Sequence, residues 1–141
     1  SEYGDRMTPH LVDFINQDWS AEDLTNAVMS RKALNKTMWQ FMERYDVLLT
    51  PTVAVPPFAL HMQGPEKIDG QIVPPFAWLA FTFPFNMTMQ TAASIPCGFS
   101  SDGMPIGLHI VGRRGDEATV LRASAAFEQA RPWAGRRPKV S

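Results

Sequence analysis

Residues 81–112 constrain the fold most strongly, because this stretch is rich in apolar residues, interrupted by proline and glycine, and almost free of acids and bases. Two apolar runs within it, residues 92–96 and 106–111, are candidate strands. The segment between them ends in Asp102 and Gly103, a dipeptide that favours a tight turn. We therefore expect two antiparallel neighbours at the edge of a mixed sheet.

Helices are predicted on both sides of this stretch. Thr8 and Pro9 are typical of a helix start, and Ser20 followed by Glu22 and Asp23 resembles a capping box. A long amphipathic helix of about 24 residues should follow Ser20, judged by the 3.6-residue period. Its apolar positions are Leu24, Val28, Leu34, Met38, Phe41 and Tyr45. A last helix, capped by Asp116, should cover the sheet with Ala118, Val120, Leu121, Ala123, Ala125 and Phe127.

The middle of the chain combines a strand with a long irregular region. Residues 47–50 form a continuous apolar run closed by Pro51, which predicts a fully buried strand and an α/β layer. Residues 51–75 are rich in proline and glycine turn dipeptides and predict an irregular loop. Residues 76–81 are apolar on every side, which favours a buried helical turn. The basic segment 135–141 is expected to be a flexible tail.

Composition excludes several classes of protein. A length of 141 residues suits one domain, and 13 basic against 14 acidic residues give no field that would attract nucleic acid. The apolar runs are too short to cross a membrane, and no secretory signal opens the chain. Cys97 is the one cysteine, which excludes an internal disulfide and favours a reducing, cytoplasmic location. Because the sequence begins with Ser1 rather than Met, we expect a piece of a longer protein.

The residues alone indicate no catalyst. Cys97 and His109 flank the same predicted hairpin, so a thiolate–imidazole pair is one interpretation, but core packing is the one we favour. His10, His61 and His109 match no zinc spacing, and neither a Gly-x-Ser-x-Gly elbow nor a phosphate-binding loop occurs. We therefore expect no catalytic residue, no metal and no cofactor in this chain.

Several short words of sequence carry more information. They are Tyr-Asp-Val-Leu-Leu-Thr-Pro-Thr at 45–52, Phe-Asn at 85–86, Ala-Ala-Ser-Ile-Pro-Cys-Gly-Phe at 92–99, Asp-Gly-Met-Pro-Ile-Gly-Leu-His-Ile-Val-Gly at 102–112 and Asp-Glu-Ala-Thr-Val-Leu at 116–121. In this order they resemble the C-terminal third of the amidase-signature hydrolases, over about residues 19–127. The resemblance implies an α/β fold, the C-terminal part of an α/β/α sandwich with a mixed sheet covered by helices. Residues 1–141 would then be a partial amidase domain.

The resemblance also implies a chemistry. Members of the family hydrolyse carboxylic amides with a serine nucleophile, a second serine in a cis peptide linkage and a lysine base, and some release ammonia from glutamine for tRNA-dependent amidotransferases. The chain has no Gly-Gly-Ser-Ser-Gly run, and Lys32, Lys36, Lys67 and Lys139 stand in other contexts. We expect the catalytic N-terminal portion to lie outside this chain, which alone should be inactive.

A substrate-pocket wall is what the resemblance leaves to this chain. The position seven residues before Asn86, an acid in some tRNA-linked members, is Leu79, flanked by Trp78 and followed by Phe83. An apolar wall cannot pair with an ammonium group, so an apolar or aromatic amide is predicted rather than glutamine. The alternative is that Trp78, Leu79 and Phe83 are core residues.

Two departures from the family pattern follow Asn86. Met89 and Thr91 stand where the family commonly has glycine and proline, and Met89 would narrow the pocket. Asn86 and Gln90 are polar within an apolar stretch, and hydrogen bonds to loop backbone are their expected task. Direct contact with the substrate is the alternative for both.

Two other functions stay open. The chain is interpreted as a non-enzymatic binding or interaction module if its apolar surface acts alone, or as a fragment of the A-type component of a glutamine amidotransferase. The expected partners are a small-molecule amide and the missing catalytic portion, with neither nucleic acid nor membrane. If the chain is stable alone, it should expose a large apolar patch or self-associate as a homo-oligomer.

Overall fold

The computed structural model describes residues 3, 6, 7 and 9–136, with the side chains of residues 9 and 10 left out. The expected cap at Thr8, the side chain of His10 and the tail residues 137–141 lie outside the described residues. The chain divides into two compact units, residues 1–33 and 34–141, which are described separately.

The first unit contains α1 (Pro9–Ile15) and the beginning of α2 (Ala21–Met42). The capping box is confirmed, because Ser20 Oγ accepts the Asp23 N–H at 3.0 Å and the Asp23 carboxylate accepts the Ser20 N–H at 3.0 Å. The hydrogen bonds that the Asp23 carboxylate accepts from the Ser20 side chain and backbone lower the pKa of Asp23. Leu24 and Val28 are exposed, so the expected apolar face of this helix is wrong over its first half.

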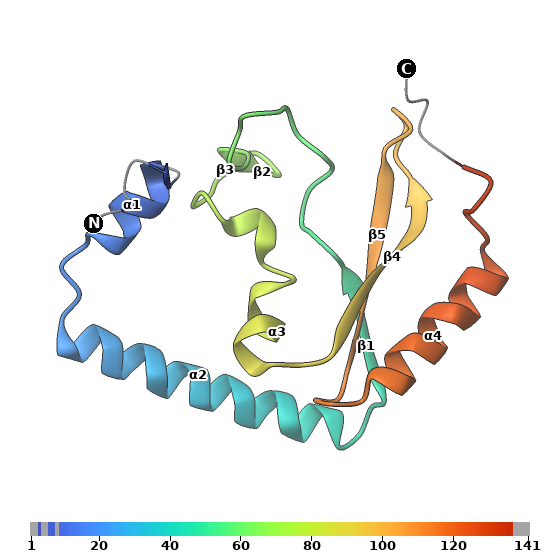
Figure 1. The fold of residues 1–141 in the computed structure, drawn as a ribbon, viewed down its shortest axis with the longest axis horizontal. Helices are drawn as coiled ribbons and strands as arrows, with labels where there is room; N and C mark the ends of the chain where they lie inside the picture. The colour runs from blue at the N-terminus through green and yellow to red at the C-terminus, as the bar shows by residue number, and fades with distance from the viewer. Residues whose placement is uncertain (1–2, 4–5, 8, 137–141) are drawn as a thin grey trace. The chain divides into compact units, whose positions relative to one another are not determined.

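The second unit is built on a three-stranded sheet with the order β1-β5-β4, formed by β1 (Val47–Pro51), β4 (Ala92–Phe99) and β5 (Pro105–Gly112) (Figure 1). The predicted hairpin is confirmed as β4 and β5, with Gly103 at φ 85° in its turn. The α/β class is confirmed. Both pairings of this sheet are antiparallel, and the parallel pair that a mixed sheet needs is not found among the described residues.

Helix α4 (Glu117–Ala130) packs on one face of β4 and β5. Asp116 caps it as predicted, since its carboxylate accepts the Thr119 N–H at 3.2 Å. Val120 is the buried side chain of this helix, and Ala123 and Phe127 are half-buried. Ala118, Leu121 and Ala125 are exposed, so the expectation that these three cover the sheet is wrong. A Cβ on Gly112 would lie 2.6 Å from Val120 Cγ2, so the helix can approach the strand this closely because residue 112 is glycine.

The opposite face packs against the last turns of α2 and against α3 (Phe83–Thr88). Its core consists of Met42, Phe85 and Val111, with Met38, Phe41 and Leu48 packed around it. In contrast to the predicted fully buried strand, β1 lies at the edge of the sheet and Leu49 is 56% exposed. The reason is that side chains alternate along a strand, and α4 packs on β4 and β5 rather than over this side of β1.

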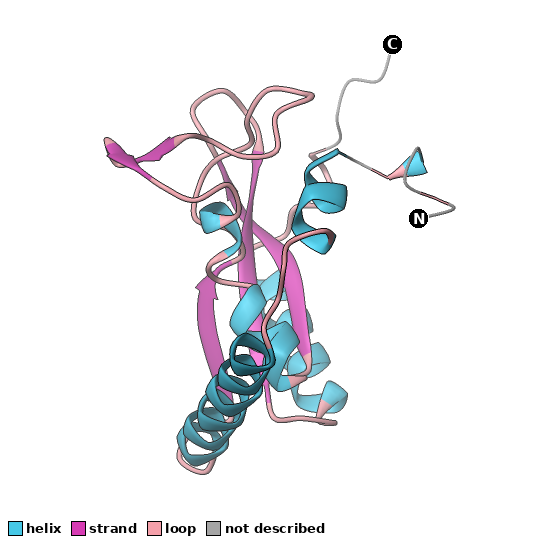
Figure 2. Ribbon diagram, turned by 90° about the vertical axis from the view of Figure 1, so that its left-hand side faces the viewer, coloured by secondary structure: helices cyan, strands magenta, loops and turns pink. Residues whose placement is uncertain are grey.

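The region 51–75 is irregular as expected, but it contains a short hairpin of β2 (Lys67–Ile68) and β3 (Gln71–Ile72) (Figure 2). Positive φ angles at Asp69 and Gly70 form its two-residue turn, which the Asp-Gly dipeptide explains. The following residues form a 3₁₀ turn, η2 (Ala77–Leu79). Phe76 and Phe81 beside it are exposed, so a helical turn is confirmed but its full burial is wrong. No helix in the described part of the chain is both long and apolar enough to span a bilayer.

Candidate functional site

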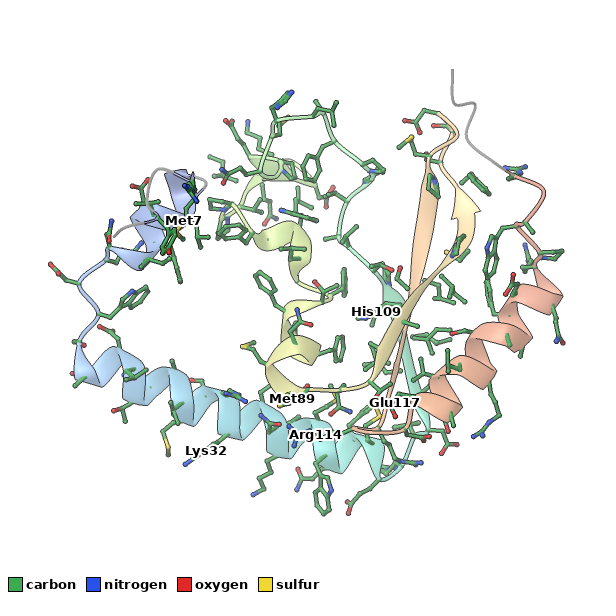
Figure 3. The ribbon with its side chains drawn as sticks, viewed as in Figure 1. Met7, Lys32, Met89, His109, Arg114 and Glu117 are labelled. Carbon is green, nitrogen blue, oxygen red and sulfur yellow. The ribbon has the colours of Figure 1, made fainter. Side chains whose placement is uncertain are left out.

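The segment that should form the pocket wall, residues 76–91, is bonded to β5 through Phe81 and through Gln90 and Thr91. It consists of η2, then α3 with Pro84 in its first turn, then Met89 as the C-terminal cap. Met89 has φ 56°, in the left-handed region that favours glycine. Figure 3 shows Met89 at the end of α3 next to the entry into β4. Met89 therefore adopts, at a conformational cost, a backbone conformation that glycine would adopt freely.

The five predicted wall residues lie in this segment but do not all line one cavity. Trp78 is held in place by its Nε1–H, which donates to the Gln63 carbonyl at 2.9 Å. Leu79 is half-buried, while Phe83 and Asn86 are exposed. Gln90 donates through Nε2 to the Gly112 carbonyl at 2.8 Å, which confirms the predicted bond to backbone for this residue.

Trp78 lies at an apolar groove of about 330 Å³ between residues 51–58 and the start of β5. The side chain stacks edge-on against Phe58, with ring centroids 5.3 Å apart. A Cβ on Gly64 would lie 2.6 Å from the Trp78 ring, so this part of the loop fits closely over the indole. The other lining residues are uncharged: Pro51, Val53, Ala54, Val55, Pro56, Pro57, Pro105, Ile106 and Gly107.

Gln90 belongs to a different groove, near the C-terminal end of α2. Its neighbours there include Trp39, Glu43, Arg113 and Arg114. Arg113 serves the fold, since its guanidinium donates to the Met42 carbonyl at 2.9 Å and lies 3.0 Å from the Asp46 carboxylate. A cation at this place complements the negative end of the helix dipole.

A pair of hydroxyl groups beside Gly107, a residue that lines the Trp78 groove, was not predicted from the sequence. Thr52 Oγ1 and Ser94 Oγ lie 2.7 Å apart across the central strand at Gly107. A Cβ on Gly107 would lie 2.5 Å from Thr52 Oγ1 and 2.8 Å from Ser94 Oγ. Glycine at 107 therefore leaves the room in which the hydroxyls of Thr52 and Ser94 meet over β5.

His109 is buried on the same face and does not interact with Cys97. The His109 Nδ1 atom lies 3.2 Å from the Phe81 carbonyl oxygen and 3.5 Å from Thr50 Oγ1. Burial lowers the pKa of His109, and the bond to Phe81 opposes this shift. Cys97 is half-buried at a β-bulge between Pro96 and Gly98. No cluster of three or more metal-ligating side chains occurs among the described residues.

Together, these contacts attach the uncharged segment 76–91 to the sheet and to the neighbouring loop through hydrogen bonds of uncharged groups. The comparison with known families gives the class: the Amidase family model matches residues 3–121, so the chain belongs to the amidase family. The acylamidase of Rhodococcus erythropolis is 38% identical over an alignment of 139 positions that covers 94% of this chain and 28% of that protein.

Other relatives extend the comparison. The A-type component of the glutamyl-tRNA(Gln) amidotransferase of Oceanobacillus iheyensis is 39% identical over 101 residues, covering 72% of this chain and 20% of that protein. Among solved structures, a bacterial aryl acylamidase of the amidase-signature family superposes with a TM-score of 0.79 at 31% identity, over 90% of this chain and 28% of that one. The chain thus spans less than a third of the length of these relatives.

Proposed function

We propose that this chain is the C-terminal part of an amidase that hydrolyses linear carboxylic amides to an acid and an amine or ammonia. The serine–serine–lysine machinery of the family would lie outside the chain, which would supply pocket wall and sheet scaffold and be inactive alone. Family membership and the relatives named as acylamidases support this proposal. The cytoplasmic location stays a prediction from the sequence.

The substrate proposed is an apolar or aromatic amide, recognised by Trp78, Leu79 and Phe83. The observation that carries it is that residues 76–91 contain no acid or base, so this wall has no carboxylate to pair with a substrate ammonium. Asn86 is exposed on α3, the helix that also contains Phe83, and would supply a polar contact to the substrate. Gln90 would act indirectly, because its amide already bonds to Gly112.

The test uses the full-length protein and compares kcat/KM for an aryl anilide, an aliphatic amide, an amino-acid amide and glutamine. The wild type should prefer the neutral amides. Leu79→Asp should lower kcat/KM for neutral amides by about tenfold to a hundredfold, since a carboxylate in an apolar pocket is costly to desolvate. Leu60→Asp is the matched control, because Leu60 is 87% exposed.

Two outcomes would contradict the proposal. A wild-type preference for glutamine would favour a glutamine amidotransferase component, which the identity to such proteins keeps as the second candidate. If the ratio of kcat/KM for neutral to amino-bearing substrates is equal in Leu79→Asp and Leu60→Asp, Leu79 does not line the pocket.

An interaction module is the candidate from another class, and the exposed apolar side chains favour it. Trp39, Leu49, Leu60 and Ile72 are among those left open in this chain. The purified chain should then bind an apolar dye or form homo-oligomers, as light scattering after size exclusion would show. A monomer that binds no dye would count against this role.

A further inference from the structure

His109 is a buried titratable side chain that the proposed chemistry does not use. It is 6% exposed, at a central position of the middle strand, where Thr50 of β1 and Ser94 of β4 are its partners in register. Its ring meets the Phe85 ring edge-on with centroids 5.4 Å apart. Figure 3 shows His109 on the side of the sheet that faces α3.

The bond from His109 reaches the backbone just before α3. The acceptor is the carbonyl of Phe81, two residues after η2 and two residues before the helix begins. A carbonyl oxygen can only accept, so Nδ1 carries the proton. Thr50 donates its hydroxyl proton to the Pro51 carbonyl at 2.9 Å, so its oxygen can also accept from Nδ1. Burial lowers the pKa of the ring and favours this neutral form.

The other end of α3 is attached to the same strand. Gln90 Nε2 donates to the Gly112 carbonyl at 2.8 Å, and the Gly112 N–H donates to the Thr91 carbonyl at 2.8 Å. Between these attachments, Phe85 and Thr88 are buried against the sheet side. Phe83, Asn86 and Met87 are exposed on the remaining surface of the helix. The bonds to β5 at both ends of α3 therefore fix where the helix lies along the strand and which of its sides faces the sheet.

We propose that His109 is a positioning residue that holds the wall segment, residues 76–91, so that Leu79 and Phe83 present a pocket of fixed shape. The inference rests on the proposed function, because it assumes that this segment contacts the substrate. His109 acts through the bond from Nδ1 to the Phe81 carbonyl, and this role requires no contact between His109 and the substrate.

Kinetics of the full-length protein test the proposal. His109→Leu should raise KM for a neutral aryl amide about fivefold to tenfold and change kcat less than about twofold, because one hydrogen bond that shapes the binding site is lost. His109→Asn should keep KM close to wild type, because the asparagine amide can donate from the place of Nδ1. Val120→Ala, on the opposite face of the sheet, is the control for a general loss of stability.

Hydrogen exchange gives a readout that does not depend on activity. Backbone amides of residues 82–89 should exchange about tenfold faster in His109→Leu than in His109→Asn, and Val120→Ala should not single out this segment. If the wild type hydrolyses no amide, the proposed function fails, while faster exchange still supports the positioning role. If His109→Leu does not fold, the nitrogen-15 spectrum of the wild-type imidazole tests the inference, because it shows which ring nitrogen carries the proton.

Three results would overturn the inference. The first is a proton on Nε2 instead of Nδ1 in the wild-type spectrum. The second is an unchanged KM together with unchanged exchange of residues 82–89 in His109→Leu. The third is a set of KM and exchange changes in His109→Asn or Val120→Ala that equals those of His109→Leu, which would reveal a merely structural role.

Discussion

The two faces of the β4–β5 hairpin are built in different ways. On the α4 face, Ile110 and Val120 are buried apolar residues and Gly112 allows close approach of the helix. On the α3 face, the apolar core is joined by directional bonds from His109 to Phe81 and from Gln90 to Gly112. Figure 1 shows α3 and α4 on opposite sides of these strands.

This difference separates stability from positioning. Apolar contact is roughly proportional to buried area and has no preferred direction, so it stabilises a helix on a sheet without fixing each backbone atom. Hydrogen bonds require a narrow range of distances and angles, so they fix where a segment lies. We therefore expect substitutions of buried apolar residues to affect unfolding most, and loss of the directional bonds on the α3 face to affect substrate recognition most.

The largest effect on stability is expected for Ile110→Ala in the full-length protein. Ile110 is 1% exposed, and removing a buried isoleucine side chain costs about 3 kcal/mol of unfolding free energy. Urea unfolding followed by tryptophan fluorescence measures it. Ile106→Ala is the matched control, because Ile106 is exposed on the same strand and should lose less than about 1 kcal/mol. Equal losses would contradict the account of this face.

Gly107→Ala should come next, because its Cβ would displace the Thr52 and Ser94 hydroxyls that meet over β5. Overpacking of this kind costs about 2 kcal/mol. The control is Gly98→Ala, in the neighbouring strand, where an added Cβ meets nothing within 4 Å. Thermal unfolding of the two variants compares them directly, and a Gly107→Ala protein as stable as Gly98→Ala would show that the hydroxyl pair does not depend on glycine.

Acid should weaken the α3 face through His109. Because the pKa of the folded state is lowered from 6.5, the unfolded chain takes up its proton first as the pH falls, and stability is lost below that value. One extra proton in the unfolded state corresponds to a slope of at most about 1.4 kcal/mol per pH unit. Urea unfolding at several pH values should show that the unfolding free energy depends less steeply on pH in His109→Asn than in wild type. Parallel slopes would rule out His109 as the source.

Met89→Gly should give the smallest effect, and it should be stabilising. Met89 adopts φ 56°, and a left-handed conformation costs a non-glycine residue about 1 kcal/mol. Met87→Gly is the control within α3, where glycine should destabilise by about 1 kcal/mol instead. If the unfolding temperature shifts in the same direction in both variants, the role of the left-handed cap is contradicted.

Local chemistry made much of the fold predictable. The capping box at Ser20, the cap at Asp116 and the turn at Gly103 follow from short-range bonds and backbone preferences, which the sequence contains directly. Burial was less predictable, because it depends on which elements cover each face. Leu49 and Leu121 are as apolar as core residues but are exposed, at 56% and 64%, in the part of the chain that the structure describes.

The hydrogen bonds that attach residues 76–91 to the sheet leave little trace in the sequence. Gln90 was recognised as a polar residue in an apolar stretch, and its bond to backbone followed from that. His109 was interpreted as a packed strand residue, which is correct, but its partner Phe81 is 28 residues away in sequence and contributes only a backbone carbonyl. A carbonyl acceptor leaves no trace in side-chain patterns. The pairing of Thr52 with Ser94 was missed for the related reason that it depends on strand register.

The most direct test of the central claim is a crystal structure of the full-length protein with a neutral aryl amide or its product acid bound. We predict that the aryl or acyl group contacts Leu79 or Phe83, and that the imidazole of His109 remains bonded to the Phe81 carbonyl without touching the ligand. A ligand bound by the protein with no contact to residues 76–91 would contradict the assignment of this segment as the pocket wall.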